Sequence, residues 1–211
     1  MVKKMATGSR REREKEQHRH QVLEAAEAVF AEKGFHNATV QEIAARAEFA
    51  VGTIYNMFES KTVIYGELVE MRAQQYIERA QHAMEQAADP VEKIRALIAA
   101  KLGFFDANQR FFQIFTRATS GGQEQLPFGP SENTRRMLGE YMEQVSGVFA
   151  EGIRSGAFAE ADPRLLTLIV EGMTNAVIAH SIHTGGQKLD AATPENIQRV
   201  VFCGLLPRRE G

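Results

Sequence analysis

The stretch "FAVGTIYNMFESK", residues 49–61, has the apolar spacing of a short helix together with a second, polar face. Its apolar residues Val51, Ile54 and Phe58 recur at intervals of three and four, which places them on one side of a helix. The opposite side carries three polar side chains: Thr53, Tyr55 and Asn56. The pattern predicts a short helix that buries one face and presents the other to a partner.

A second short helix is predicted directly before this stretch. Thr39 can begin a capping box, because its hydroxyl can accept a hydrogen bond from the backbone amide of Glu42 while the Glu42 carboxylate reaches back. The apolar residues that follow end near Ala47. A helix, a tight turn and a helix with exposed polar residues near its start form the arrangement that lays a recognition helix in a DNA major groove.

Several residues of this motif suit contact with a nucleic acid. Gly52 lets a phosphate approach the backbone closely, and the Tyr55 hydroxyl can bond to a phosphate. Thr53 and Asn56 can bond to base edges or to phosphates. Lys61, in the first turn of the next helix, adds a cation beside free backbone amides. The alternative is that Tyr55 and Asn56 lie on an ordinary solvated surface.

The longer segment "TVQEIAARAEFAVGTIYNMFESK", residues 39–61, closely resembles the DNA-binding signature of the TetR family of one-component regulators. The resemblance covers about residues 14–65 and implies a homodimer that binds double-stranded DNA at a palindromic operator. In the family pattern, glycine, serine and histidine are frequent where this chain has Glu48, Ala50 and Met57. The residues that the resemblance assigns to DNA binding, with Thr39 on a backbone phosphate, are Thr39, Gly52, Thr53, Tyr55, Asn56 and Lys61.

The whole chain of 211 residues is 44% hydrophobic, which is enough for one large or two small domains. Helical periodicity runs through nearly all of it, and no useful strand alternation is present. The predicted helix boundaries include a first helix over about 14–33 that stops at Gly34, a fourth helix from Lys61 to about Ala87, and later helices that begin at Asp89-Pro90, Asp162-Pro163 and Thr193-Pro194. We therefore predict an all-α fold with a flexible basic arm (1–13), a three-helix helix-turn-helix DNA-binding domain (14–62), and a helical ligand-binding and dimerisation domain (63–211).

Charge is distributed unevenly along the chain. Residues 1–20 contain seven Lys or Arg against three Glu, so this end carries +4 while the remainder carries −6, which together give the net charge of −2. A basic arm suits a polyanion. A solvated tail would have the same composition, so the two interpretations stay open.

The sequence contains little evidence for a secreted, membrane-spanning, enzymatic or metal-binding protein. No secretion signal is evident, and apolar runs such as 165–170 are too short to span a bilayer, so we expect a cytoplasmic protein without membrane contact. The single Cys203 excludes an intramolecular disulfide, and its apolar setting predicts a buried thiol. No catalytic motif or cofactor loop is present, so we expect no enzyme and no cofactor. His180 and His183 have the spacing of metal ligands but no further ligand nearby, which favours a pocket or an interface over a metal.

Aromatic residues gather in one part of the C-terminal region, where five of the thirteen phenylalanines lie within residues 104–115. As a set they predict an apolar effector cavity, although ordinary core packing is the favoured explanation for any single one of them. The predicted lining residues, with Asn175 or His180 at a single polar end, are Phe104, Phe105, Phe111, Phe112, Phe115, Met137, Tyr141, Met173, Asn175 and His180. The Gly- and Pro-rich segment 119–132 is predicted to be a loop, either a lid or, as we favour, disordered.

The helix that starts at Asp162 is apolar nearly all round, and two buried faces need two partners. We expect one face to pack within its own domain and the other, with the final helix, to complete a four-helix dimer interface. The predicted interface residues are Leu165, Ile169, Gly172, Ala176, Ala179, Ile197, Val200 and Val201. The alternative is a monomer in which this helix is fully internal.

These features together predict a transcriptional repressor whose dimer binds a palindromic operator and is released by a small hydrophobic effector. A helix-turn-helix protein without a small-molecule switch is the first alternative. A helical enzyme that merely carries a helix-turn-helix is the second, and it would need a cluster of perturbed titratable groups in the cavity.

Overall fold

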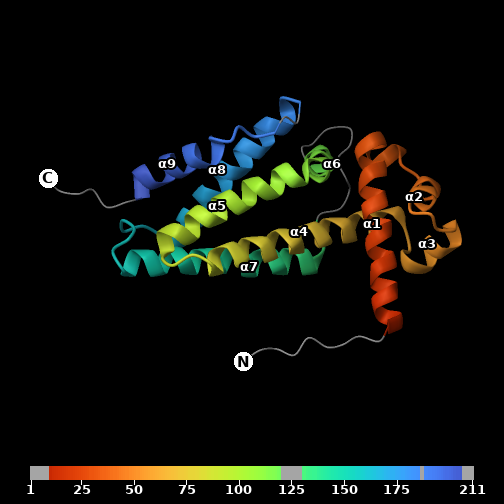
Figure 1. Ribbon diagram of the computed structural model, residues 1–211, viewed down its shortest axis with the longest axis horizontal. Coiled ribbons are helices and arrows are strands. Elements are labelled where there is room, and N and C mark those ends of the chain that lie inside the picture. The colour runs from red at the N-terminus through yellow and green to blue at the C-terminus, as the bar shows by residue number, and fades with distance from the viewer. Residues whose placement is uncertain (1–9, 120–129, 186–187, 206–211) are drawn as a thin grey trace.

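The computed structural model describes residues 10–119, 130–185 and 188–205, and these residues form nine α-helices and no strand (Figure 1). The predicted all-α fold is confirmed. The helices in chain order are α1 (Arg10–Asn37), α2 (Val40–Arg46), α3 (Val51–Met57), α4 (Lys61–Glu85), α5 (Pro90–Ala107), α6 (Gln109–Thr119), α7 (Glu132–Arg154), α8 (Pro163–His183) and α9 (Thr193–Leu205).

The first three helices form one end of the molecule. In Figure 1, α1 stands across this end, α2 and α3 lie on its outer side, and α4 leads away into the helical bundle. The predicted stop at Gly34 is present, since this residue has φ 75° and ψ 163°, a conformation open to glycine. The helix begins at Arg10 rather than Glu14, so the last four residues of the predicted arm are helical. Residues 1–9 of that arm lie outside the described residues.

The turn between α2 and α3 is built without glycine. The capping box of α2 is confirmed: Thr39 Oγ1 accepts from the Glu42 amide at 3.3 Å, and the Glu42 carboxylate accepts from the Thr39 amide at 3.0 Å. Glu48 adopts the left-handed conformation with φ 61°, which costs a residue with a side chain about 1–2 kcal/mol. Ala50 occupies the N-cap position of α3 and supplies no side-chain hydrogen bond.

The remaining helices form an elongated bundle with its own apolar core, which includes Leu97, Phe105, Tyr141 and Phe149. In Figure 1, α4 and α7 run side by side beneath α5, with α8 and α9 above. The predicted caps are present at Asp89, which accepts from the amides of residues 91 and 92, and at Asp162, which accepts from the amide of residue 164. The final helix differs: it begins at Thr193 itself, and its first helical bond ends on the Ala192 carbonyl.

The α6 helix joins the two ends of the molecule. Its Phe111 and Ile114 are buried in the apolar core of the N-terminal domain, next to residues of α1 and α4. Phe112, on the same helix, packs against both cores. The sequence pattern placed Phe111 and Phe115 in the lining of a C-terminal cavity. Both instead pack in or against the N-terminal core, because α6 turns this face toward α1. The predicted 119–132 loop is described only at its ends.

The α8 helix buries one face and exposes the other. Leu166, Val170 and Ile178 lie in the core of the bundle, whereas Leu165, Leu168 and Ile169 are 52%, 59% and 43% exposed. By length and composition alone this 21-residue helix is long and apolar enough to cross a membrane, a test that core helices of soluble proteins also pass. A third of its most apolar window is buried within the chain.

Candidate nucleic-acid interface and effector region

The α3 helix has the two faces that the sequence predicted. Ile54 is fully buried, and the adjoining Phe58 is 1% exposed. The outer face is solvent-accessible, and Tyr55 at its centre is 49% exposed. The other predicted contact residues on this face, Gly52, Thr53 and Asn56, are exposed as well. α3 itself carries no charged residue.

Gly52 is not required by the fold. A Cβ atom placed there would meet no atom within 4 Å, and the residue does not have a positive φ. Its lack of a side chain therefore leaves room on the outer face of α3. Thr39 at the start of α2 is also exposed, and its hydroxyl uses only acceptor capacity in the capping box, so the hydroxyl hydrogen can still be donated.

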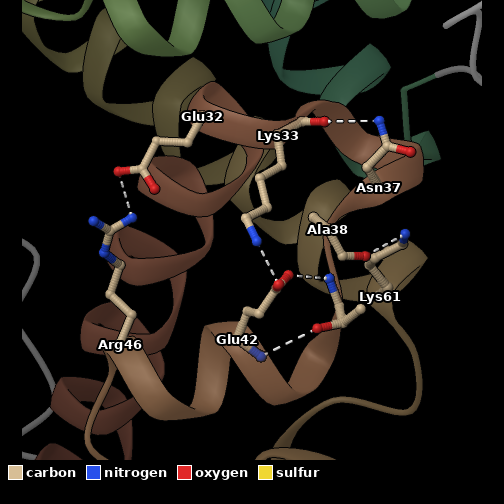
Figure 2. Close-up of polar contacts among 8 residues, drawn as sticks. Glu32, Lys33, Asn37, Ala38, Glu42, Arg46 and Lys61 are labelled. Atoms are coloured by element: carbon tan, nitrogen blue, oxygen red, sulfur yellow. Dashed lines mark hydrogen bonds and ion pairs between the residues drawn. The ribbon is translucent and has the colours of Figure 1, made fainter.

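Lys61 does not have the arrangement that the sequence suggested. Its ammonium donates to the carbonyl oxygens of Phe35, His36 and Ala38 at 2.6, 3.0 and 2.7 Å, and Figure 2 shows it turned toward Ala38. It also lies 4.6 Å from the centre of the Phe35 ring. An ammonium has three N–H donors, so none remains for a phosphate.

The reason lies at the end of α1. The carbonyl groups of Phe35, His36 and Ala38 follow the break at Gly34, and carbonyl groups at such a helix end need partners outside the helix, which the Lys61 ammonium supplies. Partial burial lowers the pKa of Lys61. In this structure Lys61 ties the end of α1 to the first turn of α4, and the predicted phosphate contact would require its ammonium to leave these carbonyl groups.

Two ion pairs join α2 to α1. Lys33 lies 2.5 Å from the Glu42 carboxylate, and Arg46 lies 2.7 Å from that of Glu32 (Figure 2). The hydrogen bond from Lys33, followed by those from Thr39, lowers the pKa of Glu42. The Glu42 carboxylate thus serves both the capping box of α2 and the ion pair with Lys33 on α1.

A third link holds the end of α3. Arg19 on α1 donates to the Met57 carbonyl at 2.6 Å, lies 4.3 Å over the Phe58 ring, and forms an ion pair with Glu67 on α4. Glu27 and Arg72 make a second, largely buried ion pair between α1 and α4, at 2.7 Å. Sequence reasoning missed both pairs, because partners 48 and 45 residues apart leave no local pattern.

The C-terminal bundle contains a buried polar chain that joins four helices. Tyr76 on α4 lies 2.6 Å from the Tyr141 hydroxyl on α7, which donates to Glu171 on α8 at 2.8 Å. Glu171 forms an ion pair with Lys101 on α5, which is 7% exposed. Because Tyr141 spends its hydrogen on Glu171, Tyr76 is the donor to Tyr141. Burial raises the pKa of both tyrosines and lowers that of Lys101.

Part of the predicted cavity lining surrounds this chain. The rings of Phe112, Phe104 and Tyr76 follow one another at centroid distances of 6.1 and 5.7 Å, and Tyr141 continues the series at 5.4 Å. Phe105 touches Phe112 at 5.3 Å. Met137 and Met173 pack against the same core. The two predicted polar residues do not: Asn175 and His180 are exposed, so the interior polar groups are Tyr76, Tyr141, Lys101 and Glu171.

The predicted dimer face is only partly as expected. On α8, Leu165, Ile169, Gly172 and Ala176 are exposed and Ala179 is half-buried, in one stripe. On α9, Val200 is 61% exposed, but Ile197 and Val201 are 7% and 4% exposed because they pack into their own bundle. Those two predictions were wrong. The buried thiol predicted for Cys203 is also wrong, since this residue is exposed.

Comparison with known proteins finds matches to both the N-terminal and the C-terminal part of the chain. The family model described as bacterial regulatory proteins, tetR family, matches residues 22–68, and the tetracyclin repressor-like C-terminal domain matches residues 87–179. The fatty acid metabolism regulator protein of Bacillus subtilis is 29% identical over 88% of this chain and 94% of its own. The solved structure of FadR from Bacillus subtilis in complex with stearoyl-CoA has a TM-score of 0.72 at 26% identity, over 88% of this chain and 98% of its own. The structure of FadR from Bacillus halodurans has a TM-score of 0.73 at 25% identity, over 88% of this chain and 98% of its own.

Replacing Lys61 by methionine tests its structural role, because methionine keeps an apolar stem beside Phe35 and removes the ammonium. Three carbonyl groups lose their donor, so we expect the N-terminal domain to lose about 1–3 kcal/mol of stability in urea titrations. Affinity for a duplex selected from a random pool should fall, while the slope of log K against log salt stays unchanged. A slope shallower by about 0.9 would instead mean a lost phosphate contact.

Proposed function

This chain belongs to the TetR family of bacterial transcriptional regulators, and on that premise we propose that it is a cytoplasmic repressor whose dimer binds a palindromic operator and releases it when a hydrophobic effector binds the C-terminal domain. The observation that carries the proposal is the outer face of α3. It is exposed, polar and uncharged, and it belongs to a helix-turn-helix whose three helices are tied together by capping and ion pairs.

The hydroxyl of Tyr55 supplies the first test. Tyr55→Phe removes one donor from an exposed position and leaves the fold intact, and a hydrogen bond to a charged group contributes about 1.5–3 kcal/mol. We expect the affinity for the selected duplex to fall about tenfold or more in fluorescence anisotropy, at an unchanged melting temperature. Equal affinity of wild type and variant would remove Tyr55 from the proposed interface.

The proposed dimer uses the exposed stripe of α8 with Val200 of α9. Apolar side chains this exposed are stabilised when a second copy covers them, and the small residues Gly172 and Ala176 let two helices come close. A dimer contact of this kind also explains why α8 is apolar on nearly all sides. One face packs into the bundle and the other against a second subunit, which needs no membrane.

Charge placed in this stripe should separate the subunits. Gly172→Glu puts a carboxylate into the proposed contact, where an unpaired buried charge costs several kcal/mol. Gly139→Glu on α7 is the matched control, because both glycines are helical, exposed and free of atoms within 4 Å of an added Cβ. In light scattering we expect monomers or aggregates for the first variant and dimers for the second. A well-folded Gly172→Glu dimer would place the interface elsewhere.

The effector is proposed to be a molecule with a long apolar part and one polar group. The aromatic series from Phe112 to Tyr141 offers apolar surface, and the buried chain that ends at Lys101 offers donors and acceptors for one polar group. The FadR regulator of Bacillus subtilis, similar over 88% of this chain, was solved with stearoyl-CoA. An acyl thioester is therefore the effector class that we propose.

Two connections can carry the signal to α3. The α4 helix is tied to α1 by Glu67 and Arg72, and its other half carries Tyr76 in the bundle. The α6 helix inserts Phe111 and Ile114 into the N-terminal core and places Phe112 against both cores. A ligand that displaces α4 or α6 would reorient α1 and the helix-turn-helix attached to it.

Stearoyl-CoA is the probe for this switch, with coenzyme A alone as the control. Operator affinity of the wild type should fall at least about fivefold with stearoyl-CoA, the low end of usual coupling. Met173→Trp should abolish that response and keep the DNA affinity, because it fills the bundle interior far from α3. If no acyl-CoA from octanoyl to stearoyl shifts wild-type affinity, regulation by acyl thioesters is excluded.

A further inference from the structure

The cations that surround α2 and α3 are already engaged within the protein. Arg19, Lys33 and Arg46 each form an ion pair, and Lys61 donates to three carbonyl groups. α3 contributes no charge. Binding to duplex DNA, however, depends mainly on cations that neutralise phosphates. Within the described part of the N-terminal domain, cations without such partners are therefore to be sought farther from α2 and α3, toward the start of α1.

Three unengaged cations lie on the first turns of α1. Arg11, Arg13 and Lys15 are exposed, and within the described part of the chain no ion pair or hydrogen bond occupies their side chains. The neighbouring Arg10 pairs with Glu14 on the surface, at 2.9 Å. In residues 10–119, 130–185 and 188–205, these three are the free cations closest to the start of the chain.

This start of α1 is not stabilised by its own fold. Residues 10–18 are exposed on every side, so the segment has no buried stripe to hold it against the domain. Its cations also stand at the positive end of the helix dipole, where anions are favoured. A polyanion alongside Arg11, Arg13 and Lys15 would therefore stabilise this segment.

The side of α1 that faces the recognition helix is identified by His18. Its ring contacts that of Phe49, at 5.1 Å, and Phe49 immediately precedes the N-cap of α3. One and two turns further, Gln21 and Ala25 line a surface hollow together with residues 46–49. The start of α3, which a helix-turn-helix presents to base edges, therefore lies beside this stripe of α1.

Arg11 and Lys15 continue the same stripe. They precede His18 by seven and three residues, which returns each of them to nearly the same side of the helix. Along the axis, Arg11 lies about 10 Å beyond His18, at a rise of 1.5 Å per residue. Arg13 is two residues from both of them and so points to the opposite side.

We propose that Arg11 and Lys15 form a second DNA contact, which holds the phosphate backbone beside the groove that α3 enters. This inference rests on the proposed function. Duplex DNA is the occupant that the position selects, because the two cations continue the stripe that contacts Phe49 in the turn before the recognition helix. The contact supplies affinity without base readout, since phosphates carry no sequence information.

The double variant Arg11→Gln/Lys15→Gln tests the proposal, with Arg13→Gln as a control that removes one positive charge from the opposite side of the same exposed helix. A duplex is first selected from a random pool with wild-type protein, and affinities are then measured by anisotropy across a salt series. The double variant should show a slope of log K against log salt shallower by about 1.8, or 0.9 for each lost contact. Arg13→Gln should keep the wild-type slope, and all proteins should prefer the same sequence.

Two results overturn the inference alone: an unchanged slope in the double variant, or a loss per charge in Arg13→Gln equal to that in the double variant, which would indicate a general charge effect. Selection of no duplex by the wild-type protein would overturn the proposed function itself, and this inference with it. Circular dichroism checks that the variants remain folded, as expected for exposed positions.

Discussion

A helix of seven residues has no stability of its own in water, and this constraint governs the DNA-binding end of the protein. α3 lacks a side-chain cap, so its position depends on the burial of Ile54 and on contacts at its end. Arg19 holds that end through the Met57 carbonyl, and Lys61 fixes the adjoining start of α4 to the end of α1. The polar face of α3 is therefore presented by a frame of three helices rather than by α3 itself.

The same frame connects DNA binding to the distant bundle. α1 is attached to α4 by two ion pairs and to α6 by buried phenylalanine and isoleucine, and in the proposed switch a displacement in the bundle would reach the recognition helix through these contacts. Coupling of this kind is reciprocal: an effector that weakens operator binding by some factor must itself bind the DNA-bound dimer more weakly by the same factor. The proposed acyl thioester would therefore have higher affinity for the free dimer.

Local features of the chain were predictable from the sequence, and features set by distant partners were not. The capping box at Thr39, the stop at Gly34 and the exposed face around Tyr55 follow from spacings of a few residues, and all are confirmed. The position of the Lys61 ammonium, by contrast, is set by hydrogen bonds to carbonyl groups 23 to 26 residues away, which no local pattern predicts. Periodicity likewise marks Ile197 and Val201 as apolar but does not tell a core from an interface. Glu48 shows the converse, because the fold imposes a left-handed turn on a residue that does not favour it.

The spacing of the two recognition helices is the quantity on which the account depends. Spin labels at Gln21→Cys, an exposed position of α1 close to the turn before α3, with the exposed Cys203 replaced by serine, report this spacing by double electron–electron resonance. The account predicts one narrow distance distribution on the operator, whose half-sites are about 34–36 Å apart, and a displaced distribution when stearoyl-CoA binds the free dimer. Coincident distributions with stearoyl-CoA bound and on the operator would contradict an effector-driven change in spacing.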